Sequence, residues 1–237
     1  MLERFAVDLP TLLAVAPVAA LFTVLAAALA GWLRVGRGVR APYTRKLFHF
    51  IILSAAMVVQ LRWGLPGTIV YGSVVAVAVL LAVARGAGNP FYEALARDTD
   101  APHRTLFILI PLATTALGGM AANAFFPTWA HVGYMVVGWG DAVGEPVGTA
   151  RGRHRYRVPS LAGVPATRSL EGSAAVFVAS VTAAAIALLV SGTSPPAVVA
   201  VSLAIGAGST VVEAASNHGI DNFTIQLAAS AIAAVLL

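Results

Sequence analysis

The stretch TLLAVAPVAALFTVLAAALAGWL, residues 11 to 33, contains no charged side chain and indicates the class of fold. A helix needs about 20 predominantly apolar residues to cross the roughly 30 Å hydrocarbon core of a bilayer. This stretch is long enough to do so. Because its apolar part is long and the acidic Asp8 precedes it, we expect an uncleaved membrane anchor rather than a signal peptide.

Similar apolar stretches recur along the whole chain. Of the 237 residues, 59% are hydrophobic and 11% are charged, against about 25% charged residues in soluble domains. The runs are rich in Ala, Val and Leu and lack the alternation of a membrane β-barrel. We therefore predict an all-α, polytopic integral membrane protein with a single transmembrane catalytic domain over residues 1–237. About eight transmembrane helices are expected, at 11–33, 47–63, 66–84, 105–126, 128–148, 171–190, 197–214 and 221–237.

The basic residues predict the topology. If the N-terminus lies outside, the loops at 34–46, 85–104 and 151–168 face one compartment, and they hold 13 of the 15 Lys and Arg residues. Only Arg4 and Arg62 fall elsewhere. Because short cytoplasmic loops are enriched in Lys and Arg, that compartment is expected to be the cytoplasm. The net charge of +5 is thus a signal of topology in a cell-membrane protein, and we expect no nucleic-acid partner.

The first motif with chemical potential is TRKLFHF, residues 44–50, where a basic loop meets the second apolar stretch. Arg45 and Lys46 could simply anchor the helix by snorkelling to lipid phosphates. His49 lies about one helical turn further on, just inside the membrane, where ionisable residues are usually functional. The three residues therefore favour a functional site.

The second motif is GWGDAVGEPVGTARGRHRYRV, residues 138–158. Its glycines recur every four residues and would form a smooth stripe on a helix, at Gly140, Gly144, Gly148 and Gly152. Such a stripe taken alone favours close packing against another helix.

Two carboxylates interrupt this apolar stretch. Asp141 and Glu145 are four residues apart, so they share one helical face, where like charges repel and are costly to desolvate without a cation. Mg²⁺ fits, because it is usually held by one or two carboxylates together with phosphate oxygens. Pro146 is expected to disturb the helix after Asp141.

A basic run from Arg151 to Arg157 follows, and it could serve membrane-surface electrostatics. The next segment is more specific. Arg168 offers a fork of donors for phosphate, Ser169 can cap a helix, and Gly172 would let a ligand approach the backbone. The free N–H groups of a helix N-terminus also attract anions.

The last motif is EAASNHGIDN, residues 213–222. SNHG predicts a tight turn, and Asp221 and Asn222 could be ordinary capping residues of the final helix. Capping does not explain Glu213, because the macrodipole disfavours an acid near a helix C-terminus. By contrast, the mixed charges of residues 85–104 show no pattern and predict a solvated connector.

Taken together, the motifs RKLFH at 45–49, GDAVGEPVG at 140–148, RSLEGS at 168–173 and EAASNHGIDN at 213–222 resemble the CTP-dependent lipid kinases, which include dolichol kinase, phytol kinase and the yeast-type diacylglycerol kinase. The resemblance implies transfer of the terminal phosphoryl group of CTP to a lipid hydroxyl, with Mg²⁺ as cofactor. The family often has Lys-Ser where this chain has Arg168-Ser169, so the phosphate contact could differ.

These residues receive the following expected roles. Asp141, with Glu145 or Glu213, holds Mg²⁺, and Asp221 is the first candidate base for the lipid hydroxyl, with His49 second. The nucleotide and its phosphates are expected to contact a larger set: Arg45, Lys46, Gly140, Gly144, Gly148, Arg151, Arg168, Ser169, Glu171, Gly172 and Asn222.

Two rival functions are open at the level of sequence. A phosphatidate cytidylyltransferase has related motifs but would release pyrophosphate and form a CDP-lipid. A transporter could use Asp141, Glu145 and Glu213 as a cation path, but the charges gather at one membrane face. The identity of the acceptor lipid cannot be predicted, because surfaces of Ala, Val and Leu contain no motif for a particular tail. The candidates are a polyprenol or dolichol, phytol or another isoprenoid alcohol, and diacylglycerol. The oligomeric state is equally without a signal.

Overall fold

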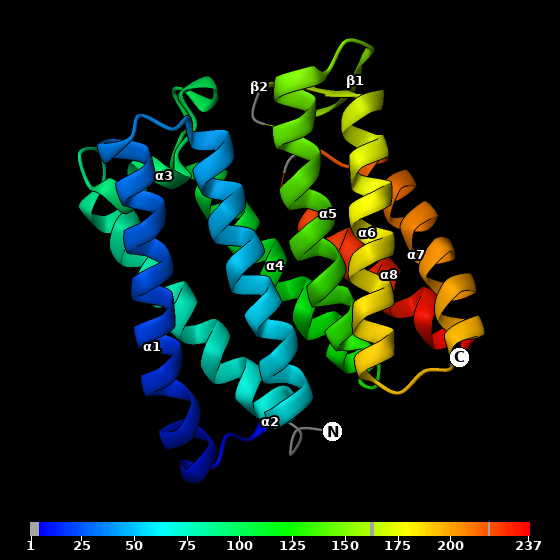
Figure 1. Cartoon of the computed structure of the whole chain (residues 1–237). Coiled ribbons are helices and arrows are strands. Elements are labelled where there is room, and N and C mark those ends of the chain that lie inside the picture. Colours follow the sequence, from blue (N-terminus) through cyan, green and yellow to red (C-terminus); the bar gives the residue numbers. More distant parts are fainter. Residues whose placement is uncertain (1–4, 162–163, 218) are drawn as a thin grey trace. The chain divides into compact units, whose positions relative to one another are not determined.

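The computed structural model describes residues 5 to 161, 164 to 217 and 219 to 237, and most of them are helical (Figure 1). The chain divides into two compact units, residues 1–108 and residues 109–237. Within the described residues, five helical segments are long and apolar enough to cross a membrane: Leu9–Gly36, Ala41–Arg85, Leu106–Phe125, Leu170–Val190 and Pro195–Ala215. The predicted class of helical membrane protein is therefore supported by the length and composition of these helices.

The first unit begins with α1 (Leu9–Gly31), which continues into a π-helical turn, η2 (Trp32–Gly36). Asp8 caps α1, because its side chain accepts a hydrogen bond of 2.7 Å from the N–H of Thr11. α1 packs against α2 (Ala41–Arg85) and the short α3 (Pro90–Leu95). A Cβ atom added to Gly31 would lie 3.1 Å from Pro90, so a small residue permits the close approach of α1 and α3.

α2 consists of two arms that meet at Gly64. A straight helix of its 45 residues would be roughly 68 Å long, about twice the hydrocarbon thickness. Gly64 has φ 61° and ψ −155°, a conformation essentially restricted to glycine, and the second arm turns back there (Figure 1). The hydroxyl of Tyr71 then donates to the carbonyl of Ile52 at 2.9 Å. The two arms correspond to the predicted helices at 47–63 and 66–84.

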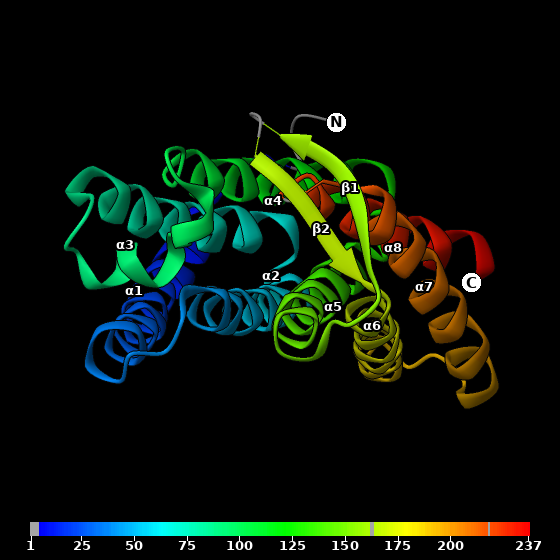
Figure 2. The same ribbon diagram turned by 90° about the horizontal axis from the view of Figure 1, so that it is seen from above.

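The second unit contains α4 (Leu106–Phe125) from Leu109 onward, and the helices α5 (Ala130–Arg151), α6 (Leu170–Val190), α7 (Pro195–Ala215) and α8 (Asp221–Leu236). α6 lies between α5 and α7, and α8 packs against α5 and α7 (Figures 1 and 2). The core of this unit includes Val136, Ala183, Ile205 and Ile225, each fully shielded from solvent.

A two-stranded antiparallel hairpin, which the sequence did not predict, accompanies the predicted all-α architecture. β1 (Arg155–Leu161) pairs with β2 (Val164–Ser169), and the hairpin contacts the ends of α5, α6 and α7 (Figure 2). Val158 and its partner Ala166 are buried, whereas Arg155 and Arg157 are exposed. Basic and other residues alternate here with the two-residue period of a strand, and this alternation was the signal in the sequence from which β1 could have been predicted.

The eight predicted stretches all coincide with helical segments, but the count of membrane crossings stays a prediction. α8 has only 16 residues, and α5 is not among the five apolar segments. The outside position of the N-terminus and the single catalytic domain also stay predictions. Arg4 lies outside the described residues.

Candidate active site

Arg168 stands at the junction of β2 and α6. It pairs in the hairpin with Tyr156, and the chain passes directly from Ser169 into α6. The Ser169 hydroxyl accepts a hydrogen bond of 3.1 Å from the N–H of Gly172, which confirms the predicted helix cap. A strand and a capped helix therefore hold the backbone of Arg168 on both sides.

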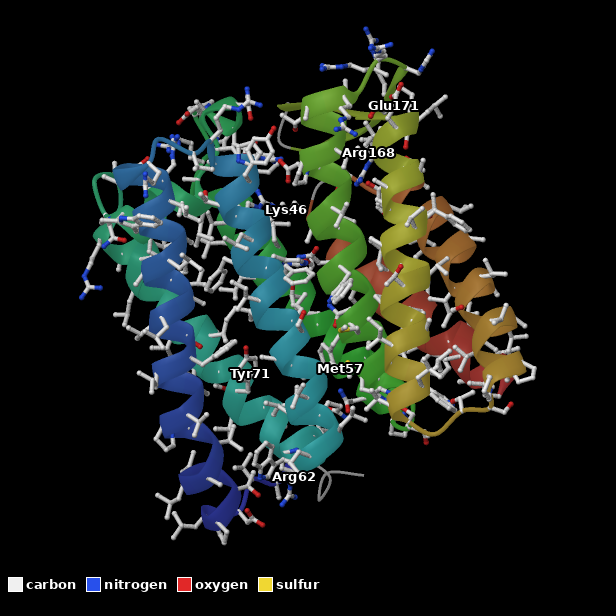
Figure 3. The ribbon with its side chains drawn as sticks, in the orientation of Figure 1. Lys46, Met57, Arg62, Tyr71, Arg168 and Glu171 are labelled. Carbon is white, nitrogen blue, oxygen red and sulfur yellow. The ribbon has the colours of Figure 1, made fainter. Side chains whose placement is uncertain are left out.

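The Arg168 side chain joins two other elements. Its guanidinium forms ion pairs with Glu213 near the end of α7 and with Asp221 at the start of α8, the latter at 2.9 Å. It also donates to the backbone carbonyl of Ser216 at 3.1 Å. The side chains of Arg168, Glu213 and Asp221 are 8%, 6% and 4% exposed. We call these three side chains the Arg168 cluster; Figure 3 labels Arg168 near the hairpin end of α5 and α6.

The turn between α7 and α8 fixes the position of Asp221. One oxygen of Asp221 accepts hydrogen bonds from the N–H groups of Gly219 and Asn222, at 2.9 and 3.0 Å. Gly219 has φ 96°, as the predicted tight turn requires, while His218 of that turn lies outside the described residues. The side-chain amide of Asn222 donates to Thr115 of α4 at 2.8 Å, so Asn222 anchors the start of α8. Its contact with nucleotide stays a prediction.

The electrostatics of the Arg168 cluster favour additional ligands. One guanidinium faces two buried carboxylates, which leaves these three side chains with a net charge of −1. Within the described part of the chain, Oε2 of Glu213 and Nε of Arg168 are buried without a hydrogen-bond partner. Buried polar and charged groups normally have partners, because leaving them unpaired costs free energy. The cluster therefore fits a cation at Glu213 and an anion such as phosphate at Arg168.

The proposed magnesium ligands are not gathered into a protein cage. No group of three or more His, Cys, Asp or Glu side chains suited to a metal ion occurs among the described residues. Asp141, Glu145 and Glu213 are thus not brought together as a ready-made trio. Mg²⁺ commonly uses only one or two carboxylates with phosphate oxygens, so the assignment of these residues stays a prediction.

α5 carries Asp141 and Glu145 on an unbroken helix. The expectation that Pro146 disturbs the helix is wrong, because α5 continues from Ala130 to Arg151 through this proline. The two carboxylates therefore keep their four-residue helical spacing. Asp141 is buried and Glu145 is partly buried, whereas Arg151 at the end of α5 is exposed.

The glycine stripe of α5 faces α6. A Cβ atom on Gly144 would lie 2.5 Å from Val176, and one on Gly148 would lie 3.2 Å from the hydroxyl of Ser169. Gly140 likewise approaches Ser180, and Gly172 of α6 closely approaches Gly144. Close packing, one of the two roles open for this stripe, accounts for these small residues. A contact of Gly140, Gly144, Gly148 or Gly172 with nucleotide stays a prediction.

Glu171 has a local partner. Its carboxylate accepts hydrogen bonds from the N–H groups of Arg153 and His154, at 3.1 and 3.3 Å, and lies 2.7 Å from Nδ1 of His154. It thereby fastens the segment after α5 to the start of α6, where the helix dipole favours an acid. We interpret Glu171 as a residue that fixes this connection, while its predicted role at the nucleotide stays untested.

In the first unit, Arg45, Lys46 and His49 lie on the first arm of α2. Lys46 is buried, and Arg45 and His49 are partly buried. Figure 3 shows Lys46 and Arg62 toward opposite ends of this arm, as expected if the arm crosses a membrane. Thr44, the neighbour of Arg45, donates to the carbonyl of Ala94 at 2.8 Å and ties the start of α2 to α3.

The solvated connector predicted at 85–104 is wrong for much of its length. Its residues form α3 and the 3₁₀ turn η3 (Asp98–Asp100), and Arg97 and Asp100 are buried. Nε of Arg97 lies 2.8 Å from Oδ2 of Asp100, and Nη1 of Arg45 lies 4.0 Å from the same oxygen. Sequence reasoning missed this arrangement, although the three-residue spacing of Arg97 and Asp100 in a charged loop was a signal.

A second ion network ties the same segment together. Arg104 binds Glu93 at 2.8 Å. Partial burial would raise the pKa of Glu93, but the hydrogen bond from Arg104, another from the N–H of Gly88, and the charges of Arg104 and Arg34 hold the pKa below its usual value. The pKa of the Arg104 guanidinium is raised by the hydrogen bond to Glu93, which outweighs desolvation. These ion pairs and hydrogen bonds fix the position of Glu93 and Arg104, which do not behave as residues of a solvated connector.

Five helical segments among the described residues have the length and composition of membrane spans, and a buried ion cluster joins β2, α7 and α8. Together they indicate a membrane protein with a charged site. Comparison with known proteins narrows this class. No family model matches the chain, and no solved structure matches it. The chain is 29% identical over 200 residues to a protein named phytol kinase from Synechocystis sp., and the match covers 81% of this chain and 78% of the relative. This similarity supports, at family level, the resemblance of the four motifs to the CTP-dependent lipid kinases.

Proposed function

We propose that the protein transfers the terminal phosphoryl group of CTP to the hydroxyl of a membrane lipid alcohol, at the cytoplasmic face of the cell membrane. The observation that carries this proposal is the similarity to a phytol kinase over 81% of the chain. The acceptor would be a polyprenol or dolichol, phytol or another isoprenoid alcohol, or diacylglycerol. The acceptor named for the relative makes phytol and other isoprenoid alcohols the first to test.

The reaction needs positioning and charge neutralisation more than covalent help from the protein. A bond forms between the lipid hydroxyl oxygen and the γ-phosphorus of CTP, and the bond from that phosphorus to the bridging oxygen breaks, releasing CDP. In the proposal, Arg45, Lys46 and Arg168 neutralise the phosphate oxygens. Buried guanidinium groups suit this role, because a fork of fixed donors matches two phosphate oxygens at once.

Asp141, with Glu145 or Glu213, would hold Mg²⁺, which when bound supplies further neutralisation of the triphosphate. The unpartnered buried oxygen of Glu213 supports its inclusion. The pairing of Glu213 with Arg168 also limits it to one free oxygen, so Glu213 would be a monodentate ligand.

Asp221 is the proposed base that accepts the proton of the lipid hydroxyl, with His49 as the second candidate. One oxygen of Asp221 is engaged by two N–H groups and the other by Arg168. Both carboxylate oxygens of Asp221 are thus already occupied by hydrogen-bond donors. Asp221 would therefore act after a bound phosphate has drawn the guanidinium of Arg168 away from it.

The lipid would enter sideways between helices and keep its apolar tail in the bilayer. The outward faces of the second unit suit contact with acyl or isoprenoid chains, since large apolar side chains are exposed on α6 and α7. Examples are Val178, Leu189, Val199 and Leu203. Only the hydroxyl needs to reach the charged residues near the membrane surface.

The test uses the purified protein in liposomes with Mg²⁺, a panel of lipid alcohols with phosphatidate, and CTP labelled separately on the α- and γ-phosphates. Label from the γ-phosphate should appear in a lipid alcohol and should be lost in Asp141→Ala. Asp98→Ala is the matched control, because its side chain is 75% exposed, and it should stay active. α-label in lipid would instead identify a cytidylyltransferase, and cation flux without any transfer would support a transporter.

A further inference from the structure

One face of α4 contacts the first turn of α8. Pro111, Thr115 and Gly118 of α4 are four and three residues apart, so they share one helical face. The side-chain amide of Asn222 donates to the Thr115 hydroxyl at 2.8 Å and lies 3.4 Å from the carbonyl oxygen of Pro111. A Cβ atom on Gly118 would lie 2.9 Å from the Cα atom of Phe223. The two helices are therefore in direct contact through polar and small residues.

Gln226 adds a second connection about one turn further along α8. Its Nε2 donates to the carbonyl of Asn222 at 2.8 Å and to the carbonyl of Thr115 at 3.3 Å. A side-chain amide has two hydrogens, so it can serve both carbonyls. Gln226 is fully shielded from solvent, where a polar group is costly to leave without partners. Gln226 therefore links the first turn of α8 to the same threonine of α4.

The turn before α8 also lies on α4. The hydroxyl of Thr114 contacts the carbonyl of Gly219, as well as the carbonyl of Ile110 in its own helix. A Cβ atom on Gly219 would lie 2.9 Å from Ile110 and 3.2 Å from Pro111. Two neighbouring threonines of α4 thus contact the two residues that flank the beginning of α8, Gly219 and Asn222.

Gly219 and Asn222 are also the two residues that orient Asp221. Their N–H groups donate to one oxygen of the Asp221 carboxylate at 2.9 and 3.0 Å. The Asp221 side chain is 4% exposed, and its other oxygen pairs with Arg168. A displacement of the two donors would displace the carboxylate with them. The contacts with α4 therefore bear on the position of Asp221.

We infer that Thr115 and Gln226 are positioning residues that hold Asp221 in place through Asn222. The inference rests on the proposed function for the role of Asp221 as the base. A base must lie within about 2.6–3.2 Å of the oxygen whose proton it accepts. A displacement of about 1 Å can lower a rate by roughly 100-fold. A threonine in an apolar helix would thereby control the rate of phosphoryl transfer.

The experiment compares Thr115→Val, Thr115→Ser and the control Thr182→Val in the liposome assay. Valine keeps the shape of threonine but lacks the hydroxyl, which serine retains. Thr182 suits the control, because its hydroxyl donates to the carbonyl of Val178 in its own helix, α6, at 2.9 Å. Thr115→Val should lower kcat by roughly 10- to 100-fold and leave the KM for CTP within about twofold of wild type. Thr115→Ser should recover most of the lost kcat, and Thr182→Val should match wild type.

Gln226→Met tests the same contact from α8 and decides the question if Thr115→Val does not fold. Methionine has a similar length but no amide, so this variant should also lower kcat without raising the KM for CTP. An active wild type whose Thr115→Val and Gln226→Met variants keep the kcat of Thr182→Val would overturn the inference and leave the proposed function standing. A KM that rises as much as kcat falls would indicate a general distortion of the site and would also overturn it.

A second measurement separates this inference from the proposed function. Hydrogen exchange followed by mass spectrometry, on the protein in detergent, reports the protection of the N–H groups of Gly219 and Asn222 without CTP or lipid. Exchange in peptides that contain these two residues should be faster in Thr115→Val and Gln226→Met than in Thr182→Val. That result would support the positioning of Asp221 by α4 even if no phosphoryl transfer is found. Equal exchange in all three variants would overturn the inference.

Discussion

The Arg168 cluster allows a sharp test of the site through Arg168→Met. This change removes the guanidinium from Glu213 and Asp221, whose side chains are 6% and 4% exposed, and keeps an apolar stem of similar length. Removing one partner of a buried ion pair costs about 3–5 kcal/mol, because the other charge is left buried and unpaired. Arg168 serves two carboxylates at once, so we expect a loss of about 5 kcal/mol, the upper end of that range.

Unfolding in mixed micelles with increasing SDS, followed by circular dichroism, would measure this loss. Arg157→Met is the matched control: Arg157 lies in β1 of the same hairpin but is exposed, so its variant should change stability by about 0.5 kcal/mol or less. Adding Glu213→Gln to Arg168→Met removes one of the stranded carboxylates and should recover part of the stability. A loss below about 1 kcal/mol for Arg168→Met, indistinguishable from the control, would refute a buried and coupled ion cluster.

Three further variants test the fold around the site. Gly144→Ala should destabilise the packing of α5 on α6 by about 1–3 kcal/mol in the same SDS assay, because its Cβ would overlap α6. Gly64→Ala should cost about 1–3 kcal/mol, because Gly64 has a backbone conformation that alanine rarely adopts. Gly72→Ala is its control and should be neutral or stabilising, since Gly72 is helical and a Cβ there would meet no other atom. Equal effects of the two variants would contradict the special conformation of Gly64 at the bend of α2. Glu93→Gln should lower the thermal midpoint at pH 7, and the difference from wild type should vanish in acid. The pKa of Glu93 is lowered in the folded protein, so the ionised carboxylate adds stability at pH values above its unfolded-state pKa of about 4.3. This stability is lost as the pH falls through the folded-state pKa.

The Arg168 cluster also bears on a difference from the kinases that the four motifs resemble. Those kinases often carry lysine where this chain has Arg168. Here the guanidinium reaches Glu213, Asp221 and the carbonyl of Ser216, which come from the two ends of one turn. A lysine ammonium is a point charge at the end of a flexible stem, whereas the arginine fork can serve partners in several directions. Arg168→Lys is therefore not a neutral exchange in this chain.

The fold class could be predicted from the sequence because hydropathy is a local property. Apolar stretches such as 171–190 and 197–214 coincide with α6 and α7, and the pattern of charges suggested a cytoplasmic face that still awaits a test. Capping is also local, and Ser169 caps α6 as predicted. The hairpin at 155–169 was missed because its strand-like alternation lies within a basic run that also suits a membrane surface.

Hydropathy and residue type along the chain indicated a helical membrane protein with four charged motifs, and they predicted which residue types could handle phosphate. The contacts between these charges are seen only in the folded chain. Arg168 and Asp221 are 53 positions apart, and Arg45 approaches Asp100 from a different helix. Helix packing creates these contacts, so no local pattern reports them. The same physics assigned the glycines of α5 to close packing with α6 and made buried ion partners of Arg97 and Asp100, which the sequence had suggested to be solvated.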